Sequence, residues 1–241
     1  MQIEGKNSVV EAINAGKTFN RLYIQKDILD NDLKSIMDLA REKGIRFELL
    51  ERKAMQTNAQ TKNYQGVIGV ITEFEYSHLD EIISKINSQK RDGFIVILDG
   101  IEDPHNLGAI LRTCECAGVD GVIIPQHRAC AINETVVKTS AGASNYVGVA
   151  KVVNINDAIK ALKDDGYWVY AVDMDGKPTK YFNLNGKIAL VIGNEGKGLH
   201  ALTKRNCDDV IGIRMHGKIN SLNASVACGI VIFECVNARV S

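Results

Sequence analysis

The segment from Gly193 to Gly198 follows an apolar run and has the composition of a ligand-binding loop. It holds three glycines in six residues, and residues without a Cβ let a ligand touch backbone atoms. Its spacing, G-x-x-G-x-G, differs from the dinucleotide fingerprint G-x-G-x-x-G, and Val191 and Gly198 do not fit a Walker A loop. Glu195 is compatible with an exposed turn residue. The loop predicts a ligand contact without identifying the ligand.

A second candidate loop runs from Ile213 to Ala224 and leads into the last predicted helix. Ser221 or Asn220 can cap that helix, and the free N–H groups of a helix N-terminus can hold a carboxylate or a phosphate. An ordinary cap on a core helix explains the same residues. Both interpretations stay open from this segment alone.

The third candidate loop follows the apolar run that ends at Leu98 and opens another helix. Asn106 stands where the N-cap of this helix is expected. The helix carries an apolar stripe, and Arg112 projects from the opposite side. Periodicity therefore favours a cap for Asn106 and a solvated charge for Arg112.

All three loops belong to a region, from residue 93 onward, in which short apolar runs alternate with helical segments. Runs that are apolar at every position suit strands covered on both faces, as in a parallel sheet between helices. Ligands bind such sheets at the carboxyl ends of the strands, where these loops lie. The predicted strands are Phe94–Leu98, Val119–Ile124, Val147–Val153, Tyr167–Val172, Ile188–Ile192 and Val210–Ile213.

Residues 1–76 are predicted to form a small α-β-α sandwich of their own. Helical patterns end at Gly16 and Gly44, and short apolar runs between and after them indicate strands. Residues 77–92 contain one helical face followed by a polar run and are interpreted as a linker. The remaining residues, 93–241, make the second domain.

Composition bounds the class of protein. With 241 residues, 45% of them hydrophobic and 24% charged, the chain is neither disordered, collagenous nor a bare coiled coil. Basic and acidic residues number 29 each, so the net charge is zero. Any nucleic-acid surface must therefore be a local patch.

Cysteine and histidine spacing does not indicate a metal site. The six cysteines include no C-x-x-C pair, and the five histidines form no H-x-x-x-H pattern. The longest apolar run, Ala224–Val236, is shorter than the roughly 20 residues that a membrane span needs. Because the N-terminal residues also lack an export signal, we expect a cytoplasmic protein without a membrane partner.

Taken in order, the three loops closely resemble the motifs of the SpoU/TrmH family of S-adenosylmethionine-dependent RNA ribose 2′-O-methyltransferases. The family's first motif has an Asn followed six residues later by an Arg, as at Asn106 and Arg112. Its second motif reads G-x-E-G-x-G, as from Gly193 to Gly198, and its third ends in Ser-Leu-Asn, as from Ser221 to Asn223.

The resemblance extends to the N-terminal residues. Ile3–Gly5 and Gln65–Val67 are similar to the small RNA-binding domain of the RlmB-like subgroup, which resembles certain ribosomal proteins. The implied fold is α/β: a parallel-sheet SPOUT methyltransferase domain with a C-terminal trefoil knot, preceded by a ribosomal-protein-like α/β domain. The implied assembly is a homodimer, in which the last helix can serve the interface.

The resemblance also implies roles for individual residues. Arg112 would lie beside the ribose 2′-hydroxyl, either as the base or as a cation that stabilises the developing oxyanion. The catalytic set it implies is Asn106, Arg112, Glu195, Ser221 and Asn223, and main-chain groups near Gly193, Ile213 and Leu222 would bind S-adenosylmethionine.

The implied activity is 2′-O-methylation of a guanosine ribose in 23S rRNA, with RNA as the partner. A tRNA ribose 2′-O-methyltransferase is the alternative within the same class. An alternative from another class is an RNA-binding assembly factor without catalytic activity. The intact motif residues argue against this alternative. A nicotinamide-dependent oxidoreductase would need the fingerprint that this chain lacks.

Overall fold

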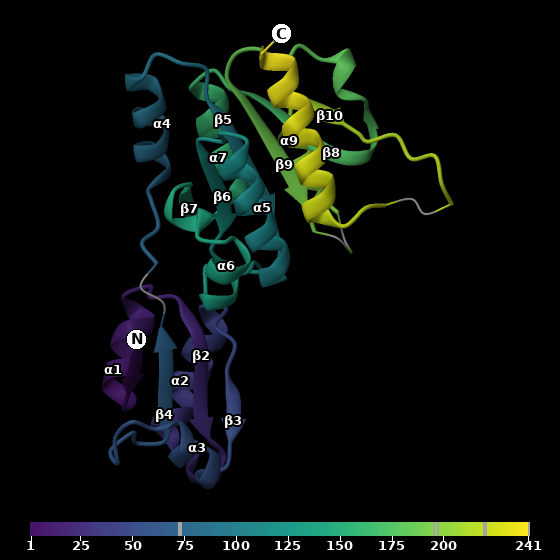
Figure 1. Ribbon diagram of the computed structural model, residues 1–241. Helices are drawn as coiled ribbons and strands as arrows, with labels where there is room; N and C mark the ends of the chain where they lie inside the picture. The colour runs from purple at the N-terminus through teal and green to yellow at the C-terminus, as the bar shows by residue number, and fades with distance from the viewer. Residues whose placement is uncertain (72–73, 195, 197, 219–220, 241) are drawn as a thin grey trace. The chain divides into compact units, whose positions relative to one another are not determined.

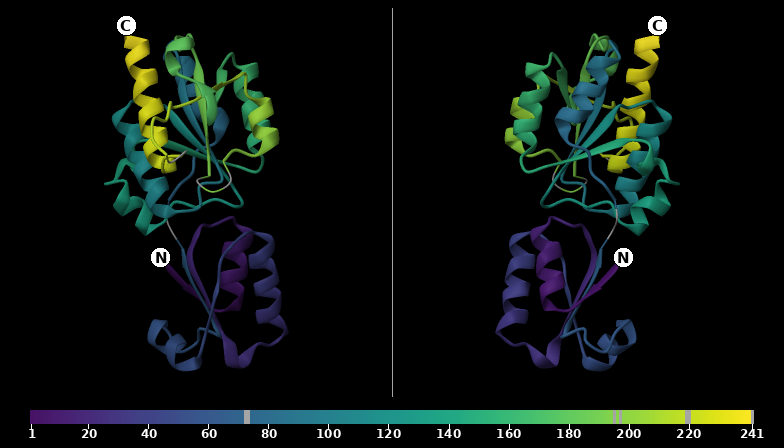
Figure 2. Two further views of the ribbon diagram at one scale, coloured as in Figure 1. Left: turned by 90° about the vertical axis from the view of Figure 1, so that its right-hand side faces the viewer. Right: turned by 90° about the vertical axis from the view of Figure 1, so that its left-hand side faces the viewer.

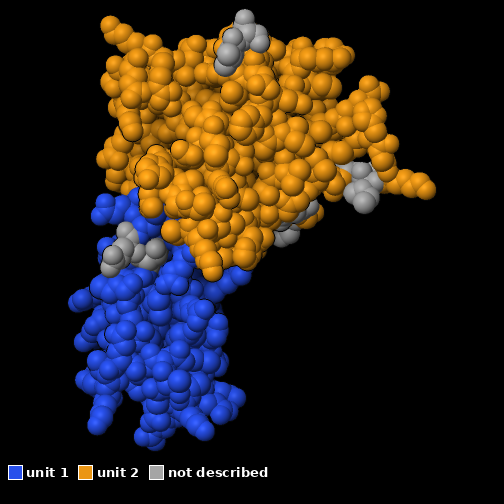
Figure 3. Space-filling view, in the orientation of Figure 1, with its two compact units in different colours: residues 1–75, 132–134 blue, residues 76–131, 135–241 orange. Residues whose placement is uncertain are grey.

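A computed structural model of the protein describes residues 1–71, 74–194, 196, 198–218 and 221–240. The chain forms two compact units, residues 1–75 with 132–134, and residues 76–131 with 135–241 (Figure 3). Each unit has its own sheet and its own apolar core. The division at residues 76 and 92 into two domains and a linker stays a prediction.

The first unit is built on a four-stranded sheet in the order β1-β4-β2-β3. Strands β2 and β3 run parallel, whereas β4 pairs antiparallel with both β1 and β2. Its elements are β1 (Gln2–Glu4), α1 (Lys6–Asn14), β2 (Phe19–Gln25), the 3-10 helix η1 (Lys26–Ile28), α2 (Asn31–Glu42), β3 (Glu48–Leu50), α3 (Arg52–Asn58) and β4 (Val67–Ile71).

Helices cover both faces of this sheet, as the predicted α-β-α sandwich requires. Helices α1 and α2 bury Val9 and Leu33 against one face. On the other face α3 buries Met55 against Tyr23 and Ile68. Helix α3 escaped prediction because its seven residues bury a single apolar side chain and so carry no amphipathic period.

The second unit is built on a six-stranded sheet in the order β10-β8-β9-β5-β6-β7, with parallel neighbours. Each strand overlaps a predicted apolar run, which confirms the parallel-sheet prediction. The elements are α4 (Leu79–Ser88), β5 (Phe94–Asp99), α5 (Pro104–Cys116), β6 (Gly121–Pro125), α6 (Glu134–Thr139), η2 (Ala143–Asn145), β7 (Gly148–Val152), α7 (Ile155–Asp164), β8 (Trp168–Lys177), η3 (Thr179–Tyr181), β9 (Ile188–Gly193), α8 (Ala201–Asn206), β10 (Asp209–Ile211) and α9 (Ala224–Val240).

Two helical layers enclose this sheet (Figures 1 and 2). On one face, Ile97 of β5 and Val191 of β9 belong to a core that also contains residues of α4 and α7. Helix α4, within the segment 77–92, joins that core through Ile82 and Ile86. On the other face α5 and α9 pack side by side.

The register of the central strands determines where the site lies. Strands β5 and β9 pair in parallel from Phe94↔Ile188 to Asp99↔Gly193, so their carboxyl ends meet at the same edge. The predicted knot would involve the chain around residues 195, 197, 219 and 220, which lie outside the described residues, and it stays a prediction. Of the helices in the described part of the chain, none has both the length and the apolar character to cross a bilayer.

Candidate functional site

A pocket of about 400 Å³ opens at the carboxyl end of β9, where a parallel sheet is expected to bind a ligand, and beside the point of β8 where its pairing with β9 ends. We call it the glycine pocket. Its lining combines three strand-end segments with the start of α9: Val172, Asp173, Met174, Ile192, Gly193, Asn194, Gly196, Gly198, Leu199, Ile213, Met215, Ser221, Leu222, Ala224 and Ala227. The pocket thus brings together the predicted residues Gly193, Ile213, Ser221 and Leu222.

The wall of the glycine pocket includes a very close approach of two backbone segments. A Cβ placed on Gly193 would lie 2.4 Å from the carbonyl carbon of Gly198 and 2.6 Å from the amide nitrogen of Leu199. Asn194 and Gly198 exchange two backbone hydrogen bonds of 2.8 and 3.1 Å, and Gly198 has a φ of 66°. Glycine is therefore required at 193 by space and favoured at 198 by conformation.

Asp99, at the end of β5, ties the neighbouring loop in place. Its buried carboxylate accepts a hydrogen bond of 3.0 Å from the His200 backbone N–H and lies 2.9 Å from His200 Nδ1. Asn194 Nδ2 donates to the Gly100 carbonyl at 2.8 Å. This role of Asp99 was not predicted from the sequence, although an acidic residue at the end of an apolar strand marks the edge of the sheet where ligands bind.

A hydrogen bond joins the first and third predicted motifs, which are 117 residues apart. Asn223 Nδ2 donates to Asn106 Oδ1 at 3.0 Å. Asn106 is buried and lies in the first turn of α5, rather than at its N-cap. The cap prediction for Asn106 was wrong, because Pro104 begins the helix and the Asp103 carboxylate accepts from the His105 N–H.

Asn223 also caps α9, the helix that follows the third loop. Its Oδ1 accepts from the Ser225 N–H at 2.9 Å and from the Ser225 hydroxyl at 2.6 Å. The predicted cap at Ser221 or Asn220 was therefore wrong: Ser221 lines the glycine pocket, and Asn220 lies outside the described residues. One amide thus holds α9 through its oxygen and α5 through its nitrogen.

Arg112 lies on the exposed side of α5, opposite the buried stripe, as the periodicity predicts. Six residues of helix place it roughly 9 Å along the axis from Asn106. It is not among the described residues that line the glycine pocket. Glu195 lies outside the described residues. The structure therefore joins Asn106 with Asn223 and places Arg112 on the same helix as Asn106.

Helices α5 and α9 each bury a cysteine where they pack together. Cys114 and Cys228 are both fully buried, and burial raises the pKa of both thiols, that of Cys228 to about 12. The thiols stay neutral and pack like small hydrophobic side chains. This packing fixes α5, and with it Asn106 and Arg112, against the helix that Asn223 caps.

Comparison with known proteins identifies the family. Residues 93–233 match the SpoU rRNA Methylase family, and residues 2–77 match the RNA 2′-O ribose methyltransferase substrate binding domain. This chain belongs to the SpoU rRNA methylase family. It is an RNA 2′-O-ribose methyltransferase with an N-terminal substrate-binding domain, which confirms the predicted enzyme class and α/β fold.

Individual relatives agree with this membership. A TrmH family tRNA/rRNA methyltransferase from Staphylococcus haemolyticus is 40% identical over 98% of this chain and 95% of its own length. The AdoMet-bound rRNA methyltransferase from Sinorhizobium meliloti is 25% identical, with a TM-score of 0.62 over 100% of this chain and 88% of its own. The A. aeolicus TrmH/SpoU tRNA modifying enzyme is 26% identical, with a TM-score of 0.57, over 67% of this chain and 84% of its own.

Proposed function

We propose that this methyltransferase acts on the ribose of a guanosine in 23S rRNA, as in the RlmB-like subgroup, with S-adenosylmethionine as methyl donor. The substrate-binding match over residues 2–77 supports an RNA substrate held by the N-terminal domain. The similar rRNA enzyme from S. meliloti aligns with the whole chain, whereas the similar tRNA enzyme from A. aeolicus aligns with 67% of it. We further propose that residues 1–76 hold the RNA.

The glycine pocket suits S-adenosylmethionine. Its volume of about 400 Å³ is within the range of small-molecule sites. Backbone groups at Gly193 and Ile213 are accessible to a heterocycle, and the apolar side chains of Ile192, Leu199 and Leu222 line the same space. When bound, S-adenosylmethionine supplies a methyl group on a positively charged sulfur.

Arg112 is the proposed catalytic residue. A ribose hydroxyl is a poor nucleophile, so the site must remove its proton or stabilise the negative charge that develops on its oxygen. A guanidinium normally stays protonated in proteins, which favours the role of a cation that also binds the neighbouring phosphate. The alternative role is that of the base.

The other predicted catalytic residues are proposed to position these groups. The hydrogen bond from Asn223 to Asn106 carries the proposal, because it connects the helix of Arg112 to the loop that lines the glycine pocket. Ser221 lines that pocket and is proposed to position the last loop. Glu195 is proposed to orient Arg112 or the RNA.

A homodimer is part of the proposal. Helix α9 exposes Val226 and Phe233, which are seven residues apart and so lie on one side of the helix. An isologous contact through this side would cover apolar surface beside α5 and Arg112. The methyl group and the hydroxyl would then meet next to a subunit boundary.

Transfer of labelled methyl groups to transcripts of 23S rRNA and of tRNA tests this function. We expect incorporation into 23S rRNA, and a decrease of about 100- to 1,000-fold for Arg112→Ala, the range seen when a charge-stabilising donor is removed. Lys160→Ala, an exposed cation on α7, is the matched control. Incorporation into tRNA alone would reassign the substrate to tRNA and contradict the proposal.

The variant Arg112→Lys separates the two roles of the guanidinium. A lysine that acts as a cation supports partial activity near pH 7 and loses it as the pH approaches about 10.4. A lysine that acts as a base gains activity over the same range, because only its neutral form accepts a proton. A pH–rate profile of this variant therefore distinguishes cation from base.

A further inference from the structure

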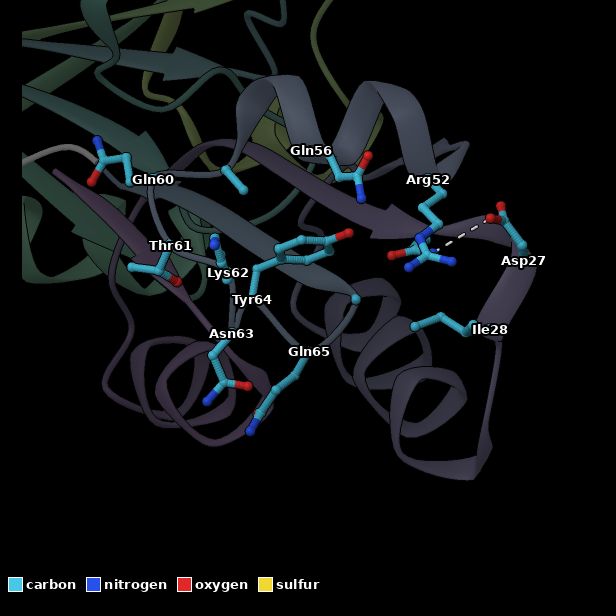
Figure 4. Close-up of a pocket in the computed structure, with 13 residues that line it drawn as sticks. Asp27, Ile28, Arg52, Gln56, Gln60, Thr61, Lys62, Asn63, Tyr64 and Gln65 are labelled. Carbon is cyan, nitrogen blue, oxygen red and sulfur yellow. Dashed lines mark hydrogen bonds between the residues drawn. The ribbon is translucent and has the colours of Figure 1, made fainter.

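A large polar cavity lies in the first unit, among residues that do not line the glycine pocket (Figure 4). Its volume is about 990 Å³, and its walls come from the end of β2, from η1, from α3 and from the loop of residues 59–66. We call it the amide cavity, because amide side chains are the commonest lining group: Gln25, Gln56, Gln60, Asn63 and Gln65.

The loop that borders the amide cavity is held at both ends. At the start of the loop, the Glu4 carboxylate accepts hydrogen bonds from the backbone N–H groups of Gln60 at 2.6 Å and Thr61 at 2.9 Å. At the end, Gln65 Oε1 accepts from the Lys6 N–H at 3.0 Å, and Gln65 has a φ of 50°, unusual for a residue with a Cβ. A strained and anchored loop of this kind is typical of a preformed binding site.

The inner wall of the cavity contains a buried amide with spare hydrogen-bonding capacity. Gln25 is 3% exposed and lines the cavity. Its Nε2 donates to the Asp27 carboxylate over a long 3.4 Å. A hydrogen bond of this length is weak, so the Gln25 amide keeps capacity to bind a polar group of a ligand.

An aromatic ring and a cation border the same space. Tyr64 is half-buried, packed beside the cluster of Tyr23, Met55 and Ile68. In Figure 4 its hydroxyl end and the guanidinium of the exposed Arg52 point toward each other across the cavity. Aromatic rings and guanidinium planes are the groups on which unpaired bases stack.

We infer that the amide cavity captures one unstacked nucleotide of the RNA substrate; this inference rests on the proposed function. The amides of Gln25 and Gln56 offer donors and acceptors to the edge of a base, Tyr64 offers a stacking surface, and Arg52 offers a second plane or a phosphate contact. A paired base exposes neither its face nor its Watson–Crick edge, so the ligand is a looped-out or single-stranded nucleotide.

Photo-crosslinking with 23S rRNA transcribed with 4-thiouridine tests the location. The full-length protein should crosslink through peptides that contain Gln56 or Tyr64, and to nucleotides that are unpaired in the RNA. Crosslinks confined to the second unit, or to paired nucleotides, would overturn the inference. Methylation of the same RNA is measured in parallel. A lack of methylation would contradict the proposed function, whereas methylation without crosslinks to the cavity would contradict only this inference.

Paired variants test the energetics. Arg52→Ala combined with Gln56→Ala removes two exposed side chains of α3 and should weaken 23S rRNA binding about tenfold or more. Lys34→Ala, an exposed cation of α2 that does not line the cavity, should change the affinity less than twofold at constant salt. If the double variant and Lys34→Ala lose the same RNA affinity, the cavity contributes only general electrostatic attraction, and the inference is contradicted.

Discussion

The glycine pocket and the amide cavity are built from different parts of the chain. The glycine pocket owes its shape to backbone segments at strand ends, which approach so closely that Gly193 has no room for a Cβ. The amide cavity owes its chemistry to polar side chains from dispersed elements of the first unit. A single substitution that displaces the backbone should therefore abolish most of the binding in the glycine pocket. In the amide cavity, each side-chain substitution should remove only part of the binding energy.

The largest effect is expected for Gly193→Ala. The new methyl group would lie 2.4 Å from the Gly198 carbonyl carbon, so the backbone that forms the pocket wall must move. Overpacking of this kind costs about 1–3 kcal/mol. If restoring the binding conformation of the pocket carries this cost, S-adenosylmethionine binds roughly 10- to 100-fold more weakly. Isothermal titration calorimetry measures it.

Gly217→Ala is the matched control for this substitution. It lies in the loop of residues 213–224 but outside the lining of the glycine pocket, and among the described residues a Cβ there would meet no atom within 4 Å. We expect a change in affinity of less than about threefold. Equal losses for the two alanines would show that the close approach at Gly193 does not determine the affinity, and the contrast between a backbone site and a side-chain site would disappear.

An intermediate effect on stability is expected at Asn106 and Asn223, whose side chains support the glycine pocket. Asn106→Ala leaves the Asn223 amide without its acceptor and should lower the free energy of unfolding by about 1 kcal/mol. Asn223→Ala also removes the α9 cap and should cost about 2 kcal/mol. Urea unfolding of both variants and of the double variant gives the coupling between them.

The matched control uses another amide pair of the second unit. Asn206 Nδ2 donates to Asn156 Oδ1 at 2.8 Å, between α8 and α7. Asn156→Ala should destabilise the protein similarly but leave S-adenosylmethionine affinity unchanged, whereas Asn106→Ala should weaken it several-fold. If the two substitutions at Asn106 and Asn223 lower the free energy of unfolding additively, so that their coupling energy is below about 0.5 kcal/mol, the proposed link between these two side chains is contradicted.

The same contrast explains what the sequence could predict. Largely apolar runs predicted the position of each described strand of the second unit, because burial on both faces leaves a signal in most residues of a strand. Strand β8 continues past the predicted end at Val172, since its last residues are less buried. The glycines from 193 to 198 predicted a ligand contact, because residues without a side chain leave the backbone accessible, and the family resemblance added Ser221 and Leu222. All of these glycines, with Ser221 and Leu222, line the glycine pocket.

Other features leave no comparable local signal. Asn106 resembles a cap from its neighbours alone, and only the fold places its side chain against Asn223. The amide cavity draws on β2, α3 and the loop before β4, and residues such as Gln25 and Gln56 are common on any polar surface. A site formed by side chains from separate elements can be recognised only once the fold shows which elements lie together.

The smallest effect is expected at Glu4, which supports the loop of the amide cavity from outside. Partial burial raises its pKa, but hydrogen bonds from Thr61, Gln60 and Gln2 outweigh this and hold the pKa below the usual 4.5. Because the folded pKa is the lower one, the carboxylate stabilises the loop above pH 4.5, and this support is lost as the pH falls through the folded pKa.

Glu4→Gln should therefore speed hydrogen exchange at the backbone amides of Gln60 and Thr61 several-fold at pH 7, because a neutral amide accepts weaker hydrogen bonds than a carboxylate. The difference from the native protein should shrink only as the pH falls through the lowered folded pKa of Glu4, where the native carboxyl becomes protonated. RNA affinity should fall by no more than about threefold, since Arg52, Gln56 and Tyr64 remain. A loss as large as that of Gly193→Ala would mean that the loop backbone, rather than the side chains, forms this site.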